Sequence, residues 1–137
     1  MKLNLSLAIF AAALTCSVGS AQSLDYRADV PFTFQVGEST MPAGHYSVKN
    51  ARGILTVSET SGKKSVFRLT LPASRAAATR EGKLTFNRYG DSYYLTNVWT
   101  AGSREGQALV ESKQEKQLSL RFKTLETASI PLLTASR

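Results

Sequence analysis

The chain has 137 residues, with 17 lysines and arginines against 10 aspartates and glutamates, and therefore carries a formal net charge of +7. It contains one histidine and one cysteine. These counts exclude a multi-histidine metal site, a two-histidine proton relay and a disulfide within the chain. A domain of this composition has to be stabilised by its own apolar core.

The first 21 residues are organised like a secretory signal peptide. Lys2 supplies a positive start, the segment from Leu3 to Thr15 is largely apolar, and the small residues Gly19-Ser20-Ala21 precede Gln22. This combination predicts export with cleavage after Ala21. The apolar segment is shorter than the roughly 20 residues that a membrane-spanning helix needs. We therefore expect a periplasmic or extracellular protein that does not span the membrane once the signal is removed.

Removing 21 of the 137 residues leaves 116, which is enough for one core of ordinary size. We expect residues 22–137 to form a single domain. Cys16 is lost with the signal, although it would become a lipid attachment site if the chain were cut just before it. The preceding Ala13-Leu14-Thr15 places threonine where such a cleavage site usually has a smaller residue, which argues against a lipoprotein.

The mature domain keeps a net charge of +6, because Lys2 is the only charged residue removed. A basic exported protein is expected to attract anionic glycan, lipopolysaccharide or phospholipid headgroups, and not nucleic acid. The alternative is a solvated surface whose charge only aids solubility. Four basic residues on predicted turns and outward strand positions are the candidate anion contacts: Lys63, Lys64, Arg68 and Lys83.

Alternating apolar residues predict β-strands through the first half of the mature chain. Every second residue of Val30–Val36 is apolar, and Pro31 marks an edge or a bulge because proline cannot donate a ladder hydrogen bond. Pro42-Ala43-Gly44 predicts a turn into a strand with Tyr46 and Val48 inward.

Hairpins follow, in which Ile54–Glu59 and Ser65–Leu71 are expected to pair as neighbours. Arg68 is predicted to point outward, so the apolar residues that alternate with it would share the opposite face. These residues are Phe67, Leu69 and Leu71.

Lys83–Arg88 and Ser92–Thr100 are the next predicted strands, joined by a turn at Tyr89-Gly90-Asp91. One face of the second strand would carry Tyr93, Leu95, Asn97 and Trp99. Tyr93, Asn97 and Trp99 could then line a small apolar pocket with one polar anchor, as in a barrel that carries a ligand. The structural alternatives are core packing, with the Asn97 amide bonded to backbone at a bulge or facing the rim.

The last third contains one predicted helix. Ser112 and Glu115 have the spacing of a capping box, which favours a helix from about Lys113 with Leu118, Phe122 and Leu125 on one stripe. The competing prediction is a strand, because Leu118, Leu120 and Phe122 also alternate. A terminal segment, Ser129–Thr134, is expected to close the sheet as an edge strand.

Sequence signatures for catalysis are missing. There is no Gly-x-Ser-x-Gly element to accompany His45, and the glycines occur singly, which excludes a P-loop and a dinucleotide fingerprint. Several carboxylates lie near predicted strand ends, but no pair of them stands out for glycoside hydrolysis. We therefore expect no catalytic, cofactor-binding or metal-binding residue. The carboxylates considered are Asp29, Glu38, Glu59, Asp91 and Glu105.

Four pieces in order carry a resemblance to a known family. They are Val30-Pro31-Phe32-x-Phe34-x-Val36-Gly37, then Met41-Pro42-Ala43-Gly44-x-Tyr46-x-Val48, then Phe86-x-Arg88-Tyr89-Gly90-Asp91-x-Tyr93-x-Leu95-x-x-Val98-Trp99, then Ser112-x-x-Glu115-x-x-Leu118. Together they cover nearly the whole mature chain and resemble a family of small exported bacterial proteins of unknown function. The resemblance implies a β-rich exported domain and carries over no functional residue.

The expected fold is mainly β, a single antiparallel β-barrel or β-sandwich of about seven strands with one short C-terminal helix. The expected function is a non-catalytic structural or binding module at the cell envelope. A small barrel that carries an apolar ligand is the alternative from another class, and a hydrolase is the third.

The export prediction is tested by fractionating cells that express the full chain. We expect folded protein in the periplasmic or culture fraction without detergent, because the predicted strands are shorter than the roughly nine residues that a membrane-spanning strand requires. Recovery from the outer membrane alone, and only in detergent, would contradict the prediction.

Overall fold

The computed structural model describes residues 24–134, so the predicted signal peptide and Cys16 lie outside the described residues. This part of the chain forms ten strands and one helix. In chain order they are β1 (Leu24–Val30), β2 (Phe34–Val36), β3 (Ser39–Met41), β4 (Gly44–Ala51), β5 (Ile54–Glu59), β6 (Ser65–Ser74), β7 (Gly82–Tyr89), β8 (Ser92–Trp99), β9 (Glu105–Leu109), α1 (Lys113–Arg121) and β10 (Glu126–Thr134).

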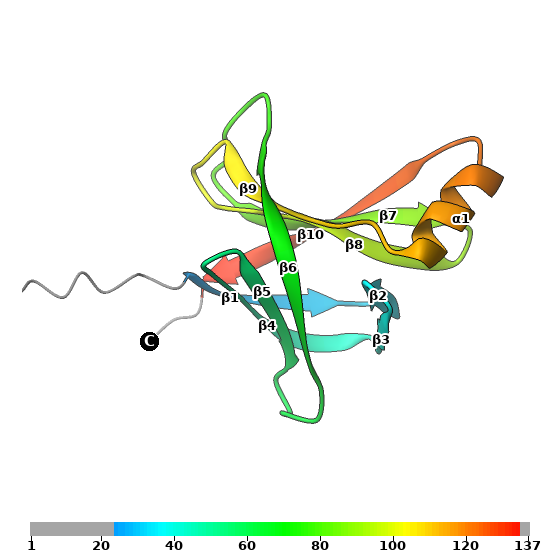
Figure 1. The fold of residues 1–137 in the computed structure, drawn as a ribbon. Coiled ribbons are helices and arrows are strands. Elements are labelled where there is room, and N and C mark those ends of the chain that lie inside the picture. The colour runs from blue at the N-terminus through cyan, green and yellow to red at the C-terminus, as the bar shows by residue number, and fades with distance from the viewer. Residues whose placement is uncertain (1–23, 135–137) are drawn as a thin grey trace, which may run out of the picture.

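Eight of these strands close into an antiparallel barrel in the order β8-β7-β10-β1-β4-β5-β6-β9, with β9 pairing back onto β8. The short strands β2 and β3 pair with each other, and β2 joins β8 in parallel at Gln35 and Tyr94. Figure 1 shows β2, β3 and α1 together at one end of the barrel. The prediction of a mainly β fold with one short helix is confirmed, and the architecture is a closed barrel.

Side chains fill the interior of the barrel. Large residues from opposite walls, including Tyr46, Leu55 and Phe86, are almost completely buried. The ring of Phe34 contacts Tyr46 and Phe86 edge to face, at centroid distances of 5.1 and 5.4 Å. Such contacts give the interior the close packing of a protein core.

Proline divides the first predicted strand into two. The alternation over Val30–Val36 predicts one strand, but β1 ends at Val30 and β2 begins at Phe34. Pro31 lacks the N–H group that a continuing ladder would need. The chain therefore leaves the barrel wall here, and Phe32 stacks on Tyr93 with centroids 3.9 Å apart.

The C-terminal strand is an interior member of the sheet and not the edge strand that the sequence predicted. β10 begins at Glu126, pairs with β7 from Glu126 to Leu132, and pairs with β1 at Leu133 and Thr134. Closure of the barrel leaves it with neighbours on both sides.

Strand β6 has the opposite orientation to the predicted one. Val66 and Thr70 are buried, and Phe67, Leu69 and Leu71 are exposed. Because side chains alternate along a strand, a difference of one residue in register exchanges its two faces. Thr70 tolerates its inward position because its hydroxyl donates a hydrogen bond to the Gly53 carbonyl at 3.1 Å.

Strand β9 passes so close to β8 that one position admits only glycine. A Cβ atom on Gly106 would lie 2.5 Å from Cε3 of Trp99 and 2.6 Å from the Val98 carbonyl oxygen. Neither backbone nor a packed indole ring can yield by that amount without moving the β8–β9 ladder that closes the barrel.

Replacing this glycine should therefore destabilise the fold. We expect Gly106→Ala to lower the free energy of unfolding by about 1–3 kcal/mol, the usual cost of overpacking. Gly44→Ala is the matched control, because a Cβ there has no atom within 4 Å, and its effect should stay within about 0.5 kcal/mol. Urea unfolding curves measure both, and equal midpoints for the two variants would contradict the prediction.

Candidate functional site

Helix α1 begins where the capping box predicts, but the glutamate side chain of the box contacts the barrel and not the start of the helix. Ser112 is the N-cap and its hydroxyl accepts the Glu115 N–H at 3.2 Å. The Glu115 carboxylate turns toward the barrel, where Oε1 accepts hydrogen bonds from Asn87 Nδ2 and from the Tyr89 hydroxyl, both at 3.2 Å. Glu115 is only 5% exposed. A polar side chain therefore attaches this helix to the outer wall of the barrel.

The predicted apolar stripe of the helix does not form. Phe122 leaves the helical conformation and caps the helix, so the helix ends at Arg121. Leu118 is partly buried, whereas Phe122 and Leu125 are exposed. The early end of the helix removes the last turn that would have brought these side chains into one row.

Burial raises the pKa of Glu115 above the ordinary value of 4.5. The hydrogen bonds from Asn87 and Tyr89 act in the other direction by stabilising the carboxylate, and the charge of Glu111 raises the pKa further. Burial, followed by the charge of Glu115, likewise raises the pKa of Tyr89. The group is thus a carboxyl–phenol–amide cluster held in a poorly solvated position.

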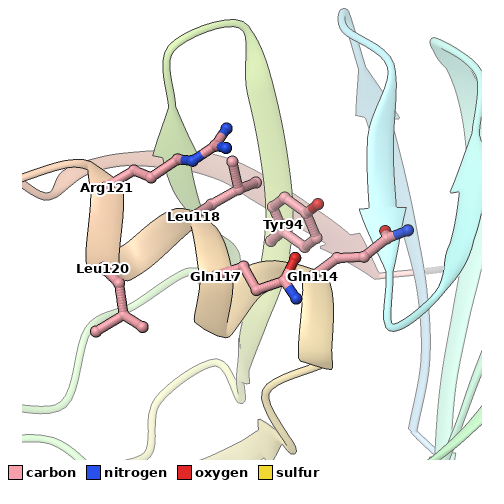
Figure 2. Close-up of a pocket in the computed structure, with 6 residues that line it drawn as sticks. All are labelled: Tyr94, Gln114, Gln117, Leu118, Leu120 and Arg121. Carbon is pink, nitrogen blue, oxygen red and sulfur yellow. The ribbon is translucent and has the colours of Figure 1, made fainter.

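A shallow hollow of about 490 Å³ lies on the flank of α1. Figure 2 shows Leu118 and the amide end of Gln117 beside the Tyr94 ring, with the amide end of Gln114 and the side chain of Leu120 directed away from it. Arg121 completes the lining. Two amides and a guanidinium around an aromatic surface offer hydrogen-bond donors to a polar ligand, but the hollow is open to solvent.

The predicted pocket of Tyr93, Asn97 and Trp99 does not form, because a bulge in β8 interrupts the alternation. Thr85 pairs with Asn97 and Phe86 pairs with Leu95, which leaves Thr96 without a partner in the ladder. The Thr96 hydroxyl donates to the Thr85 carbonyl at 3.0 Å. Beyond the bulge the two faces of the strand are exchanged.

The three residues therefore lie on different faces of the strand. Tyr93 precedes the bulge and packs against the core. Asn97 and Trp99 follow the bulge and face outward, where Trp99 Nε1 donates to the Thr85 hydroxyl at 3.1 Å. The Arg75 guanidinium lies 5.2 Å from the centroid of the Trp99 ring. A bulge at Asn97 is one of the alternatives that the sequence predicts, but the position of the bulge depends on the pairing with β7.

The four candidate anion contacts do not gather on one face. Lys63 is exposed in the turn between β5 and β6, and the Lys64 ammonium donates to the Thr40 carbonyl of β3. Lys83 lies at the start of β7, opposite Trp99 and Pro131. In Figure 1 the β5–β6 turn is at the bottom of the molecule, well separated from the start of β7.

Arg68 does not point outward as predicted. It lies on the inward side of β6 between Val66 and Thr70, and its guanidinium occupies the space beside Gly37, where a Cβ atom would lie 1.5 Å from one of its nitrogens. Its place near the β2–β3 turn follows from the exchanged faces of β6.

The same exchange creates an exposed apolar row on the outer wall, which we call the β6 stripe: Phe67, Leu69 and Leu71. Their exposed fractions are 67%, 74% and 59%. Ile54 is the register partner of Leu69, and Val110 follows the end of β9, so both extend the stripe. A groove of about 440 Å³ runs beside it and is also lined by charged side chains: Glu38, Arg68, Glu111 and Lys113.

The single histidine has a carboxylate partner on the neighbouring strand. His45 Nδ1 and Asp29 Oδ1 form a hydrogen bond between β4 and β1, with side chains 76% and 68% exposed. Within residues 24–134, no group of three or more metal-ligating side chains is arranged to hold a metal ion. In the same range, no helix is long and apolar enough to cross a membrane.

Comparisons of this chain with protein-family models, with curated proteins and with solved structures gave no match. The resemblance to a family of small exported proteins therefore stays a prediction.

The Glu115 cluster makes a signed prediction about pH. Since the pKa of Glu115 is raised in the folded protein, its contribution to stability is present below the ordinary value of 4.5 and is lost as pH rises through the folded value. The Glu115→Gln variant does not lose this stability as pH rises, because glutamine does not ionise. Its stability relative to wild type should increase between about pH 4 and about pH 7, as urea unfolding at both pH values would show.

Glu38→Gln serves as the control, because Glu38 is exposed in the turn between β2 and β3. If the free energy of unfolding of Glu115→Gln relative to wild type stays constant or falls as pH rises, the assignment of a raised pKa to Glu115 is contradicted.

Proposed function

We propose that this protein is exported and acts as a non-catalytic binding module at the cell envelope, and that it contacts anionic surfaces through the outer face of β5 and β6. The observation that carries the proposal is the β6 stripe. Three large apolar side chains in a row on the outside of a closed barrel form the kind of exposed patch that marks an interaction surface.

The arrangement of the barrel interior favours this proposal over a ligand carrier. A carrier needs an open cavity of a few hundred Å³, but the space between the walls is occupied by packed side chains such as Tyr46 and Phe86. The residues that would have lined the ligand pocket lie on different faces of β8. The available recognition surface is thus on the outside.

A hydrolase is also less well supported. Glu111 and Glu115 line one hollow of about 570 Å³ between α1 and the barrel. Glycoside hydrolysis requires two accessible carboxyl groups facing each other across a cleft. The Glu115 carboxylate is buried and accepts hydrogen bonds from Asn87 and Tyr89, so it supports the helix instead of facing a substrate.

The proposal predicts retention by anionic surfaces that weakens with salt. The purified protein should bind a sulfated polysaccharide resin or vesicles containing phosphatidylglycerol, and should lose affinity at high ionic strength because exposed charges are screened. Removing two cations beside the stripe, with Lys63→Gln and Arg52→Asn, should weaken binding several-fold. Asparagine suits position 52 because the residue there has φ 53°.

The double variant Lys116→Gln, Lys123→Gln makes the same change in net charge at α1 and beyond it, and should have the smaller effect. Thermal unfolding checks that all variants remain folded. Equal retention by neutral and anionic surfaces, or retention by neither, would overturn the proposal. Equal losses in the two double variants would overturn the assignment to the β5–β6 face.

A further inference from the structure

We propose that the β6 stripe inserts into the surface of an anionic phospholipid bilayer, with the cations at its two ends in contact with lipid headgroups. This inference rests on the proposed function and names the surface that the β5–β6 face would recognise.

The stripe is a side-chain surface and not a free strand edge. Phe67, Leu69 and Leu71 are at alternate positions of β6, so they project from one face. β6 pairs with β5 along Ser65–Leu69 and with β9 along Thr70–Ser74. Each half of β6 therefore has one ladder neighbour and one edge without a ladder partner, but the three apolar side chains project from the face of the strand and not from that edge. The feature that needs an occupant is the exposed apolar area itself.

Basic side chains lie at both ends of the stripe. Lys63 is exposed in the β5–β6 turn just before β6, whereas the ammonium of the neighbouring Lys64 donates to the Thr40 carbonyl. At the other end, Arg52 adjoins Gly53, whose carbonyl accepts the Thr70 N–H at 2.8 Å, so the β4–β5 turn lies beside this end of the stripe. In the adjoining groove two acids are accompanied by two bases: Glu38, Glu111, Arg68 and Lys113.

This combination distinguishes a bilayer from the other anionic surfaces. A glycan or a soluble polyanion would contact the cations but would leave the three apolar side chains in water. A bilayer offers phosphate groups at the level of the cations and an acyl region into which exposed apolar side chains can partition.

The charge distribution also disfavours a second copy of the chain. Packing one stripe on another would bring together the basic ends of two mature domains that each carry a net charge of +6. Like charges brought together oppose association. A bilayer with anionic headgroups reverses the sign of that interaction.

The experiment is co-sedimentation with vesicles of phosphatidylcholine alone or mixed with phosphatidylglycerol. Mass spectrometry first verifies that residues 1–21 are absent from the preparation, because that apolar segment would bind lipid by itself. The triple variant Phe67→Thr, Leu69→Thr, Leu71→Thr should reduce partitioning into mixed vesicles by at least about tenfold, since apolar burial scales with the area removed from water. Threonine keeps a high preference for strands, so folding is preserved.

The matched control is Leu133→Thr, which removes a leucine that is 57% exposed on β10. In the barrel order β10 is four strands away from β6 in either direction, so it belongs to the opposite wall. This variant should bind mixed vesicles as the wild type does.

Insertion is tested separately from adsorption. Phe67→Trp should show a blue-shifted emission component with mixed vesicles and should be quenched by brominated acyl chains, and Leu133→Trp should show neither effect. Trp99 is present in both variants, so the difference between their spectra reports the introduced residue.

The outcomes separate this inference from the proposed function. Binding to the sulfated resin together with no binding to mixed vesicles, or with vesicle binding unchanged in the triple variant, would overturn the bilayer inference and leave the anionic-surface proposal standing. A concentration-dependent dimer that is lost in the triple variant would identify a second copy as the occupant and overturn the inference. Binding to neither surface would overturn both.

Discussion

Closure of the sheet by the β8–β9 ladder is the constraint on which the other features of this protein depend. Residues 97–99 of β8 pair with residues 106–108 of β9, and this pairing joins the two ends of an eight-strand order. Each strand of the ring thereby has two neighbours and one face directed inward. The close approach at Gly106 and the bulge at Thr96 both belong to this junction.

Closure is also the reason that the function proposed above uses the outside of the barrel. The inward faces supply a packed core, so little space is left for a ligand between the walls. On the outside, helix α1 covers part of β7, where Asn87 and Tyr89 contact Glu115. That cover is attached by hydrogen bonds to a buried carboxylate, an arrangement that costs desolvation energy but specifies one position for the helix.

The β6 stripe is the feature that packing within the domain does not explain. β6 buries Val66 and Thr70 and exposes larger side chains at Phe67 and Leu69. Burying Thr70 requires hydrogen bonds to Gly53 and Gln107, whereas a leucine at that position would require none. A strand that places its larger apolar residues in solvent sacrifices core stability, which is reasonable where the exposed face contacts a partner.

The sequence by itself determined the β class, the approximate strand segments, the turn at Pro42-Ala43-Gly44 and the helix start at Ser112. These are local properties, because alternation, turn preference and capping depend on residues within a few positions of one another. The same local rules assigned apolar residues to the inward side, which is why β6 was assigned with its faces exchanged. They also placed Tyr93, Asn97 and Trp99 on one face of β8.

Only the tertiary structure decided which face of each strand became the interior. The register between β7 and β8 placed the bulge at Thr96, and the pairing of β6 with β5 and β9 turned Phe67 outward. Closure of the barrel gave β10 two neighbouring strands, β7 and β1. The position of α1 on β7 buried the Glu115 side chain. Pairings of this kind join residues far apart in the chain, so their energies depend on contacts that no local pattern contains.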